Sequence, residues 1–78
     1  MNKLKLKEAT QKYVIYLYWP EGKGTHGEIL MNIGDNEATI VSRSEEDSAG
    51  RYAFKAAKAV KERVEKRILP LEFIQAWV

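Results

Sequence analysis

Few residues of this chain have the chemistry for catalysis or metal binding. There is no cysteine, and the single histidine, His26, lies beside Gly27 with no second residue to orient it as a base. The run Ser44-Glu45-Glu46-Asp47 gathers three acids that could hold a cation, but no further acid or histidine lies nearby in the sequence. We therefore expect no catalytic, metal or cofactor site, and a protein that is not an enzyme.

A second motif, Gly22-Lys23-Gly24-Thr25, shares residue types with a phosphate-binding loop. That loop requires a glycine, four residues and then Gly-Lys-Ser/Thr, placed between a strand and a helix. Here Gly24 is followed by Thr25 and then by a segment typical of a strand. The motif therefore indicates the tip of a β-hairpin.

The chain is organised around the segment Tyr13-Val14-Ile15-Tyr16-Leu17-Tyr18-Trp19, which Pro20 closes. β-branched and aromatic residues dominate this segment, which predicts a strand. Side chains alternate between the two faces of a strand, and neither face is polar here. Both faces therefore need a cover, and we expect the single helix of the chain to cover one of them.

Further strands are predicted on both sides of this segment. Residues 27–33 and 37–43 fit strands, joined by a turn at Gly34-Asp35-Asn36, where glycine and asparagine tolerate positive φ. Two tight connections imply an antiparallel meander over residues 12–43. Residues 1–11 begin with alternating Lys and Leu, which predicts an edge strand or a basic arm.

One helix is predicted over residues 45–67. Ser44 is expected to cap it, and the three acids that follow lie where the helix dipole favours negative charge. At 100° per residue, seven apolar residues fall on one stripe: Ala49, Ala53, Ala56, Ala57, Val60, Val64 and Ile68. The alanines let this helix approach the sheet closely, and Pro70 is expected to stop it.

The ending, residues 70–78, is unusually apolar and includes Phe73, Ile74 and Trp77. Such side chains are seldom left in water, so we expect this tail to fold back on the domain, as a short strand or a 3₁₀ turn, with Trp77 as its anchor. The sequence thus predicts one α+β domain over residues 1–78. Three or four antiparallel strands pack on one helix, in the order β-β-β-α with the apolar tail last.

The composition describes a small globular protein, 78 residues long, with 45% hydrophobic and 31% charged residues and a net charge of +2. A chain of this size buries only about 60% of its unfolded surface. Since it has no cysteine for disulfides, association with another chain is one remaining way to gain burial. No apolar run of about 18 residues and no signal-peptide pattern is present. We expect a cytoplasmic protein that does not contact membranes.

The preferred function is a non-enzymatic interaction protein. If the helix covers Ile15, Leu17, Ile29 and Met31, the other sheet face stays open, because one helix cannot cover both faces. The predicted interaction face then consists of apolar and aromatic residues: Val14, Tyr16, Tyr18 and Leu30, with Trp77 from the tail. Its occupant would be a second copy of the chain, forming a homodimer, or an unknown protein partner.

The alternative is a nucleic-acid-binding module. Residues 51–67 hold seven basic residues against two acidic ones, and the contacts would come from Arg51, Lys55, Lys58 and the N-terminal lysines. The predicted strand-strand-strand-helix order over residues 12–67, with its alanine-rich helix, resembles the C-terminal part of a double-stranded RNA-binding domain. That family places lysines at the start of this helix, where this chain has acids. The resemblance therefore weighs against RNA binding.

A second resemblance covers more of the chain. It rests on five features in this order: the tyrosine-rich strand with Pro20-Glu21-Gly22, Gly27-Glu28-Ile29, the acidic helix start at residues 45–47, Gly50-Arg51-Tyr52-Ala53, and Pro70 with Ala76-Trp77. In this order the segments look like small uncharacterised proteins of Firmicutes prophages and related mobile elements. The resemblance implies a small accessory protein, and no site residues follow from it.

Overall fold

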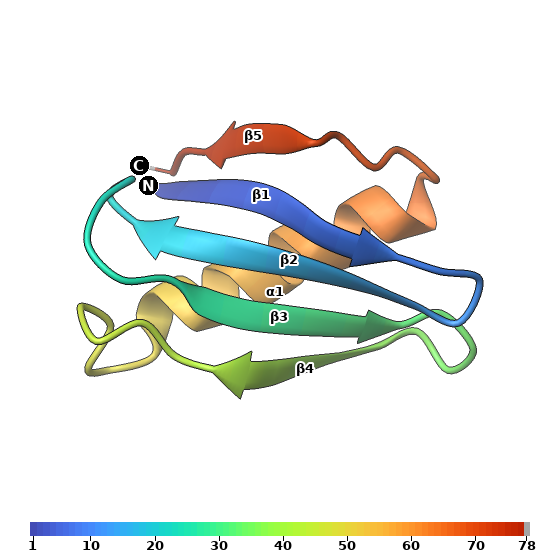
Figure 1. Ribbon diagram of the computed structural model, residues 1–78, viewed down its shortest axis with the longest axis horizontal. Helices are drawn as coiled ribbons and strands as arrows, with labels where there is room; N and C mark the ends of the chain where they lie inside the picture. The colour runs from blue at the N-terminus through green and yellow to red at the C-terminus, as the bar shows by residue number, and fades with distance from the viewer. Residues whose placement is uncertain (78) are drawn as a thin grey trace.

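The computed structural model describes residues 1–77 as one five-stranded sheet and one helix. Its elements are β1 (Asn2–Ala9), β2 (Tyr13–Pro20), β3 (Gly27–Asn32), β4 (Glu37–Ser42), α1 (Arg51–Glu65) and β5 (Glu72–Gln75). All neighbouring strands are antiparallel, in the order β4-β3-β2-β1-β5 (Figure 1). The predicted α+β class and meander are confirmed, but the sheet has five strands where three or four are expected.

The first and last strands account for the difference. β1 pairs with β2 on one side and with β5 on the other, so Lys3 lies opposite both Trp19 and Ile74. β1 is therefore an inner strand and neither an edge strand nor a free arm. The tail folds back as predicted, and it does so as a strand. Val78, the last residue of the predicted tail, lies outside the described residues.

A buried polar side chain joins these two strands to the helix. Asn2 is 0% exposed, and its Nδ2 donates hydrogen bonds to the carbonyl oxygen of Tyr52 (3.0 Å) and to Oε1 of Gln75 (3.1 Å). Gln75 in turn donates from Nε2 to the carbonyl oxygen of Lys55 (2.7 Å). These bonds hold β5 against α1, whereas Oδ1 of Asn2 is buried and has no hydrogen-bond partner within residues 1–77.

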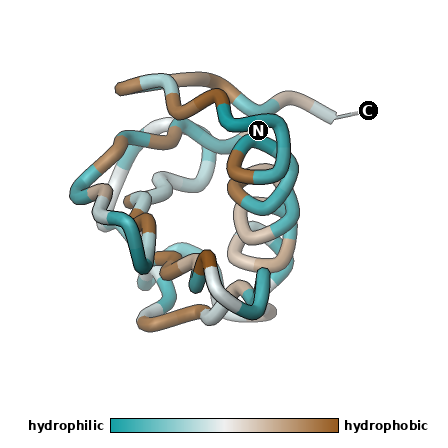
Figure 2. The backbone as a smooth tube through the Cα atoms, turned by 90° about the vertical axis from the view of Figure 1, so that its right-hand side faces the viewer, coloured by the Kyte–Doolittle hydropathy of each residue, from teal (hydrophilic) through white to brown (hydrophobic). Residues whose placement is uncertain are grey.

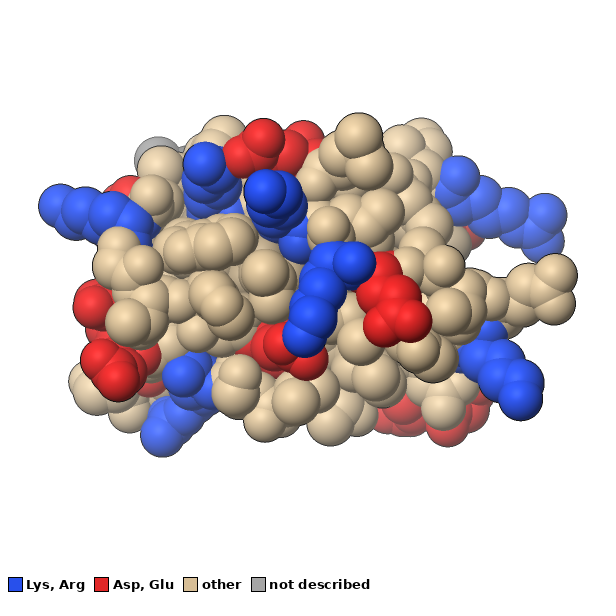
Figure 3. Space-filling model, viewed as in Figure 1, with Lys and Arg blue, Asp and Glu red and all other residues tan. Residues whose placement is uncertain are grey.

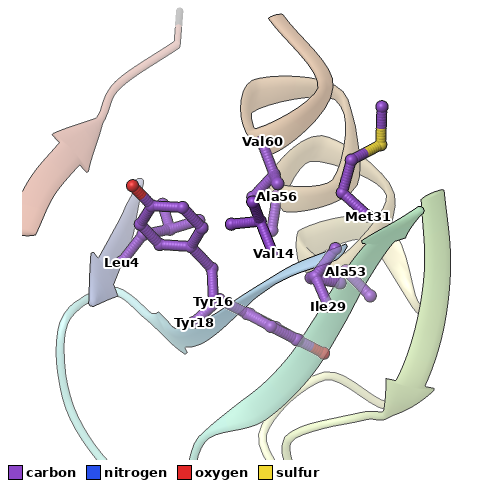
Figure 4. Close-up of a cluster of buried hydrophobic side chains, with 9 residues drawn as sticks. All are labelled: Leu4, Val14, Tyr16, Tyr18, Ile29, Met31, Ala53, Ala56 and Val60. Atoms are coloured by element: carbon purple, nitrogen blue, oxygen red, sulfur yellow. The ribbon is translucent and has the colours of Figure 1, made fainter. Parts of the chain in front are cut away.

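The hydrophobic core lies between α1 and one face of the sheet (Figure 4). Its fully buried members are Leu4, Val14, Tyr16, Tyr18, Ile29, Met31, Ala53, Ala56 and Val60. The helix contributes small residues to this core, which lets it lie close to the strands that carry the large ones. Within residues 1–77 no second layer covers the opposite face of the sheet (Figure 2).

The helix begins later than predicted, at Arg51 instead of residue 45. Gly50 adopts a φ of 75°, which ends the regular helical backbone on that side, and no acid occupies the first turn. The free amides are capped from a distance by Asp47, whose carboxylate accepts hydrogen bonds from the N–H groups of Tyr52 (3.2 Å) and Ala53 (2.9 Å). The prediction that Ser44 caps the helix is therefore wrong.

The helix also ends earlier than predicted, at Glu65 instead of residue 67. Arg67 adopts a left-handed φ of 58°, and the N–H of Ile68 donates to the carbonyl oxygen of Arg63 (3.0 Å). This pattern closes the helix before Pro70 is reached. As a result Ile68, expected on the buried stripe, is 59% exposed.

The largest correction concerns which sheet face the helix covers. Directly opposite residues of an antiparallel pair place their side chains on the same side of the sheet. Tyr16 lies opposite Ile29, and Val14 lies opposite Met31, so these four share the buried face. Ile15 and its alternate neighbours face away from the helix. The arrangement in which the helix covers Ile15 and Leu17 together with Ile29 and Met31 is wrong. Ile15 pairs with Leu30 and Leu17 with Glu28, so the β2 residues of that set lie on the opposite face from its β3 residues.

Candidate interaction surface

The sheet face opposite α1 carries a row of apolar side chains, which we term the open face. Its members come from β2, β3 and β5: Ile15, Leu17, Trp19, Leu30 and Ile74. The strand register places Ile15 opposite Leu30, whereas Lys3 of β1 separates Ile74 from Trp19. Figure 3 shows this side of the molecule, where uncharged side chains form an area that charged ones cross and border.

Lysines of β1 lie across the open face. Nζ of Lys3 is 3.0 Å from Oε1 of Glu72, and Nζ of Lys7 is 3.0 Å from Oε1 of Glu28. Exposed ion pairs of this kind contribute little free energy, but they hold the aliphatic stems of the lysines over the sheet. Lys5 has no ion-pair partner within residues 1–77. The open face is thus an apolar row with charges of both signs around it.

The structure places most of the predicted interaction face elsewhere. Val14, Tyr16 and Tyr18 are 0% exposed beneath α1, so the folded protein does not present them to a partner. Leu30 does lie on the open face and is half-buried. The predicted face therefore combined residues from the two opposite sides of the sheet.

Trp77, the remaining residue of that predicted face, packs on the outer side of the helix start. Its ring contacts the ring of Tyr52 edge-on, with 5.6 Å between centroids, and Nζ of Lys55 lies 5.2 Å from the centroid of the indole. Trp77 is half-buried by these contacts. It serves as the anchor of the tail, as the sequence predicts.

The predicted nucleic-acid contacts are divided between two sides of the molecule. Arg51, Lys55 and Lys58 belong to α1, whereas the lysines of β1 cross the open face. Lys55 is half-buried against Trp77, and Arg51 and Lys58 are exposed. The helix and β1 therefore do not contribute to a single basic surface.

A polar network joins the β2–β3 loop to the loop before α1. Oε2 of Glu46 accepts hydrogen bonds from the hydroxyl (2.8 Å) and the backbone N–H (2.9 Å) of Thr25. The Ser44 hydroxyl lies 2.6 Å from the carbonyl oxygen of Thr25 and 2.9 Å from the same Glu46 oxygen, and it can donate to one of them at a time. These bonds, those from Thr25 foremost, lower the pKa of Glu46 to about 2.

The network has a serine beside a carboxylate but lacks the base that activates a nucleophile. The ring of His26 packs edge-on against Trp19, with 5.3 Å between centroids, and no hydrogen bond joins it to Ser44. We therefore interpret the network as a structural link between two loops.

The acids at positions 45–47 point to separate partners. Glu46 binds Thr25, whereas Asp47 binds Tyr18 and the first amides of α1. In the part of the chain that the structure describes, no three His, Cys, Asp or Glu side chains gather in a way that could hold a metal ion. Within the same residues, no helix has the length and apolar character needed to cross a membrane.

No protein-family model matches this chain, and neither the curated proteins nor the solved structures include a match. The resemblances to prophage proteins and to the double-stranded RNA-binding domain therefore stay predictions.

Proposed function

We propose that this chain is a small interaction protein that self-associates through its open face. The observation that carries the proposal is a set of apolar side chains on a sheet face that no element of residues 1–77 covers. Ile74 is 56% exposed, Leu17, Trp19 and Leu30 are half-buried, and Ile15 is 9% exposed. A small domain gains stability when such a row is buried against another chain. This face replaces the one predicted from the sequence.

A second copy suits the charge of this face. A two-fold axis presents the same patch on both copies. It can bring the unpaired Lys5 of one copy near Glu28 or Glu72 of the other, so the patch is complementary to itself in charge.

The test is the mass in solution, measured by light scattering over a concentration series at low and high salt. We expect a dimer that persists in high salt, because apolar burial holds it. Leu17→Thr and Trp19→Thr keep strand-forming residues on the open face and should shift the midpoint of dimerisation upward about tenfold or more. Phe54→Ser, on the helix side of the molecule, is the matched control and leaves the midpoint unchanged. A monomer at every concentration rules out self-association.

Nucleic-acid binding through Arg51, Lys55 and Lys58 is the second candidate. It is disfavoured because the basic residues of α1 and the lysines of β1 lie on two different sides of the molecule. An electrophoretic mobility assay with duplex RNA and with single-stranded DNA distinguishes it. Nucleic-acid binding should weaken steeply with salt and be lost in the Lys55→Glu, Lys58→Glu double variant. Neither the higher salt nor this double variant should change the dimerisation midpoint.

A further inference from the structure

The outer side of β4 is an unprotected sheet edge. β4 pairs only with β3, so within residues 1–77 its outward amides and carbonyls have no strand partner. Its sequence, Glu-Ala-Thr-Ile-Val-Ser, has three β-branched residues in succession and neither lysine nor proline, the residues that commonly block edge pairing. A bulge disturbs its pairing near Val41, whereas residues 37–40 keep a regular register with β3. This regular part of β4 can accept a further strand.

A groove runs between this edge and the helix. It has a volume of about 420 Å³ and is lined by residues of β4 and α1: Glu37, Ala38, Ile40, Phe54, Ala57, Lys58 and Lys61. Phe54 is 69% exposed and Ile40 is 42% exposed, although both are large apolar side chains. A strand added to β4 would direct every second side chain into this groove.

The groove is lined by two lysines and one acid, Glu37, so its positive balance favours an acidic occupant. Lys58 and Lys61 lie on its helix wall, and neither has an ion-pair partner within residues 1–77. They follow Phe54 by one and two turns of α1, so the groove is apolar toward Phe54 and basic toward Lys61. A matching strand would carry apolar side chains followed, at alternate positions, by carboxylates.

We propose that the β4 edge and this groove bind an extended segment of another protein as a sixth strand of the sheet. Backbone hydrogen bonds to β4 would hold the segment, its apolar side chains would pack on Phe54 and Ile40, and its carboxylates would pair with Lys58 and Lys61. This site lies on a sheet edge and the helix side, apart from the open face, so it does not depend on self-association.

The experiment is an NMR titration of ¹⁵N-labelled protein with a synthetic octapeptide. Val, Ile, Glu and Glu occupy alternate positions of the peptide, with Ser or Thr between them. We expect shift changes confined to residues 37–42 and 54–61, together with slower hydrogen exchange at the outward amides of β4. A peptide with Lys in place of both Glu, and one with Pro in place of Ile, should not bind.

Variants of exposed residues separate the two parts of the site. Phe54→Ser should weaken binding of the acidic peptide about tenfold. The Lys58→Glu, Lys61→Glu double variant should weaken binding of the acidic peptide by about tenfold or more. Arg51→Glu, on the same helix but outside the groove, is the charge control and leaves the affinity within about twofold. Leu17→Thr, on the open face, also leaves it unchanged.

Three results would overturn the proposal. The first is no shift change at millimolar peptide, and the second is a set of shifts centred on the open face. The third is concentration-dependent protection of the β4 amides without peptide, which would assign the edge to a second copy of the chain. The two proposals can be tested independently. If Leu17→Thr disrupts the dimer and peptide binding persists, the peptide site does not depend on the open face.

Discussion

The phenolic hydroxyl of Tyr18 lies 3.0 Å from Oδ2 of Asp47 and donates a hydrogen bond to it beneath the start of α1. The same hydroxyl accepts a hydrogen bond from the N–H of Ser44 at 3.1 Å. Since Asp47 also accepts bonds from two amides of the first helical turn, it links the central strand to the helix. The buried Tyr18 is thereby tied to the first turn of the helix.

Asp47→Ala should lower the free energy of unfolding by about 2–4 kcal/mol, because it removes the helix cap and leaves buried donors without an acceptor. That is a large part of the roughly 4–12 kcal/mol expected for a domain of this size. Urea denaturation followed by circular dichroism measures the loss. Glu45→Ala, at an exposed neighbouring acid, is the control and should change stability by less than about 0.5 kcal/mol. A double-mutant cycle with Tyr18→Phe should show coupling between the two sites.

Glu46 should make stability depend on acid pH. Its pKa is lowered from 4.5 to about 2 by hydrogen bonds from Thr25 and Ser44. A carboxyl whose pKa is lower in the folded state stabilises the fold above its unfolded pKa, so this contribution is lost as the pH falls from about 4.5 to about 2. Carbon NMR of the Glu46 carboxyl follows the titration. Thr25→Val removes the donor hydroxyl and should raise the midpoint. A midpoint near 4.5 in the unaltered protein would contradict the assignment.

Gly27→Ala should destabilise the sheet strongly. Gly27 lies opposite Tyr18, and a Cβ at this position would meet the Tyr18 ring and lie 2.7 Å from the carbonyl oxygen of Ser42. Overpacking of this kind costs about 1–3 kcal/mol and displaces the ring that holds Asp47. Gly34→Ala is the matched control, because the nearest atom to its added Cβ is 3.5 Å away. Thermal unfolding of the two variants should separate them clearly, and equal melting temperatures would refute the packing argument.

The four tyrosines should ionise late when the pH is raised. Burial raises the pKa of Tyr18 to about 12 and also raises that of Tyr16, while hydrogen bonds to carboxylates raise those of Tyr13 and Tyr52. A tyrosine whose pKa is higher in the folded state stabilises the fold below pH 10, and this contribution is lost as the pH rises further. Absorbance at 295 nm should therefore report tyrosine ionisation above pH 10. The last tyrosine to ionise, Tyr18, should do so together with unfolding.

Local patterns in the sequence predict the elements of this fold well. The β-branched and aromatic run at 13–19, the turn signals around Gly34 and the alanine stripe from Ala53 to Val60 each specify one element, and the structure contains all of them. The places of β1 and β5 in the sheet are harder to predict. β5 has only four residues and is stable only through its neighbour, and β1 lies inside the sheet only because β5 pairs with it. Their pairing joins residues about 70 positions apart, which no local pattern reports.

The face of the sheet that the helix covers could not be read from β2 alone. Every side chain of that strand is apolar or aromatic, so the alternation carries no polarity, and the register with β3 decides which half is buried. A usable signal does exist in β1. Lys3 and Lys5 alternate with the buried Leu4, so the lysines mark the solvent side, and their cross-strand partners Trp19 and Leu17 belong to it.

The start of the helix was misplaced for a related reason. Acids after a serine are a common helix signature, but Asp47 reaches its two amides only because Gly50 turns the backbone through a positive φ. The position of Asp47 also depends on Tyr18, a contact between residues far apart in the chain. Sequence spacing alone does not separate a cap at Ser44 from one at Asp47.

The placement of β1 between β2 and β5 also has a consequence for protein synthesis. The ribosome delivers β1 before β5, so one edge of β1 lacks its partner until residues 72–75 have emerged. During that interval the backbone groups of β1 that pair with β5 have no partner, and the Asn2 side chain lacks its bond to Gln75. The nascent chain therefore exposes a sheet edge that β5 covers in the folded protein.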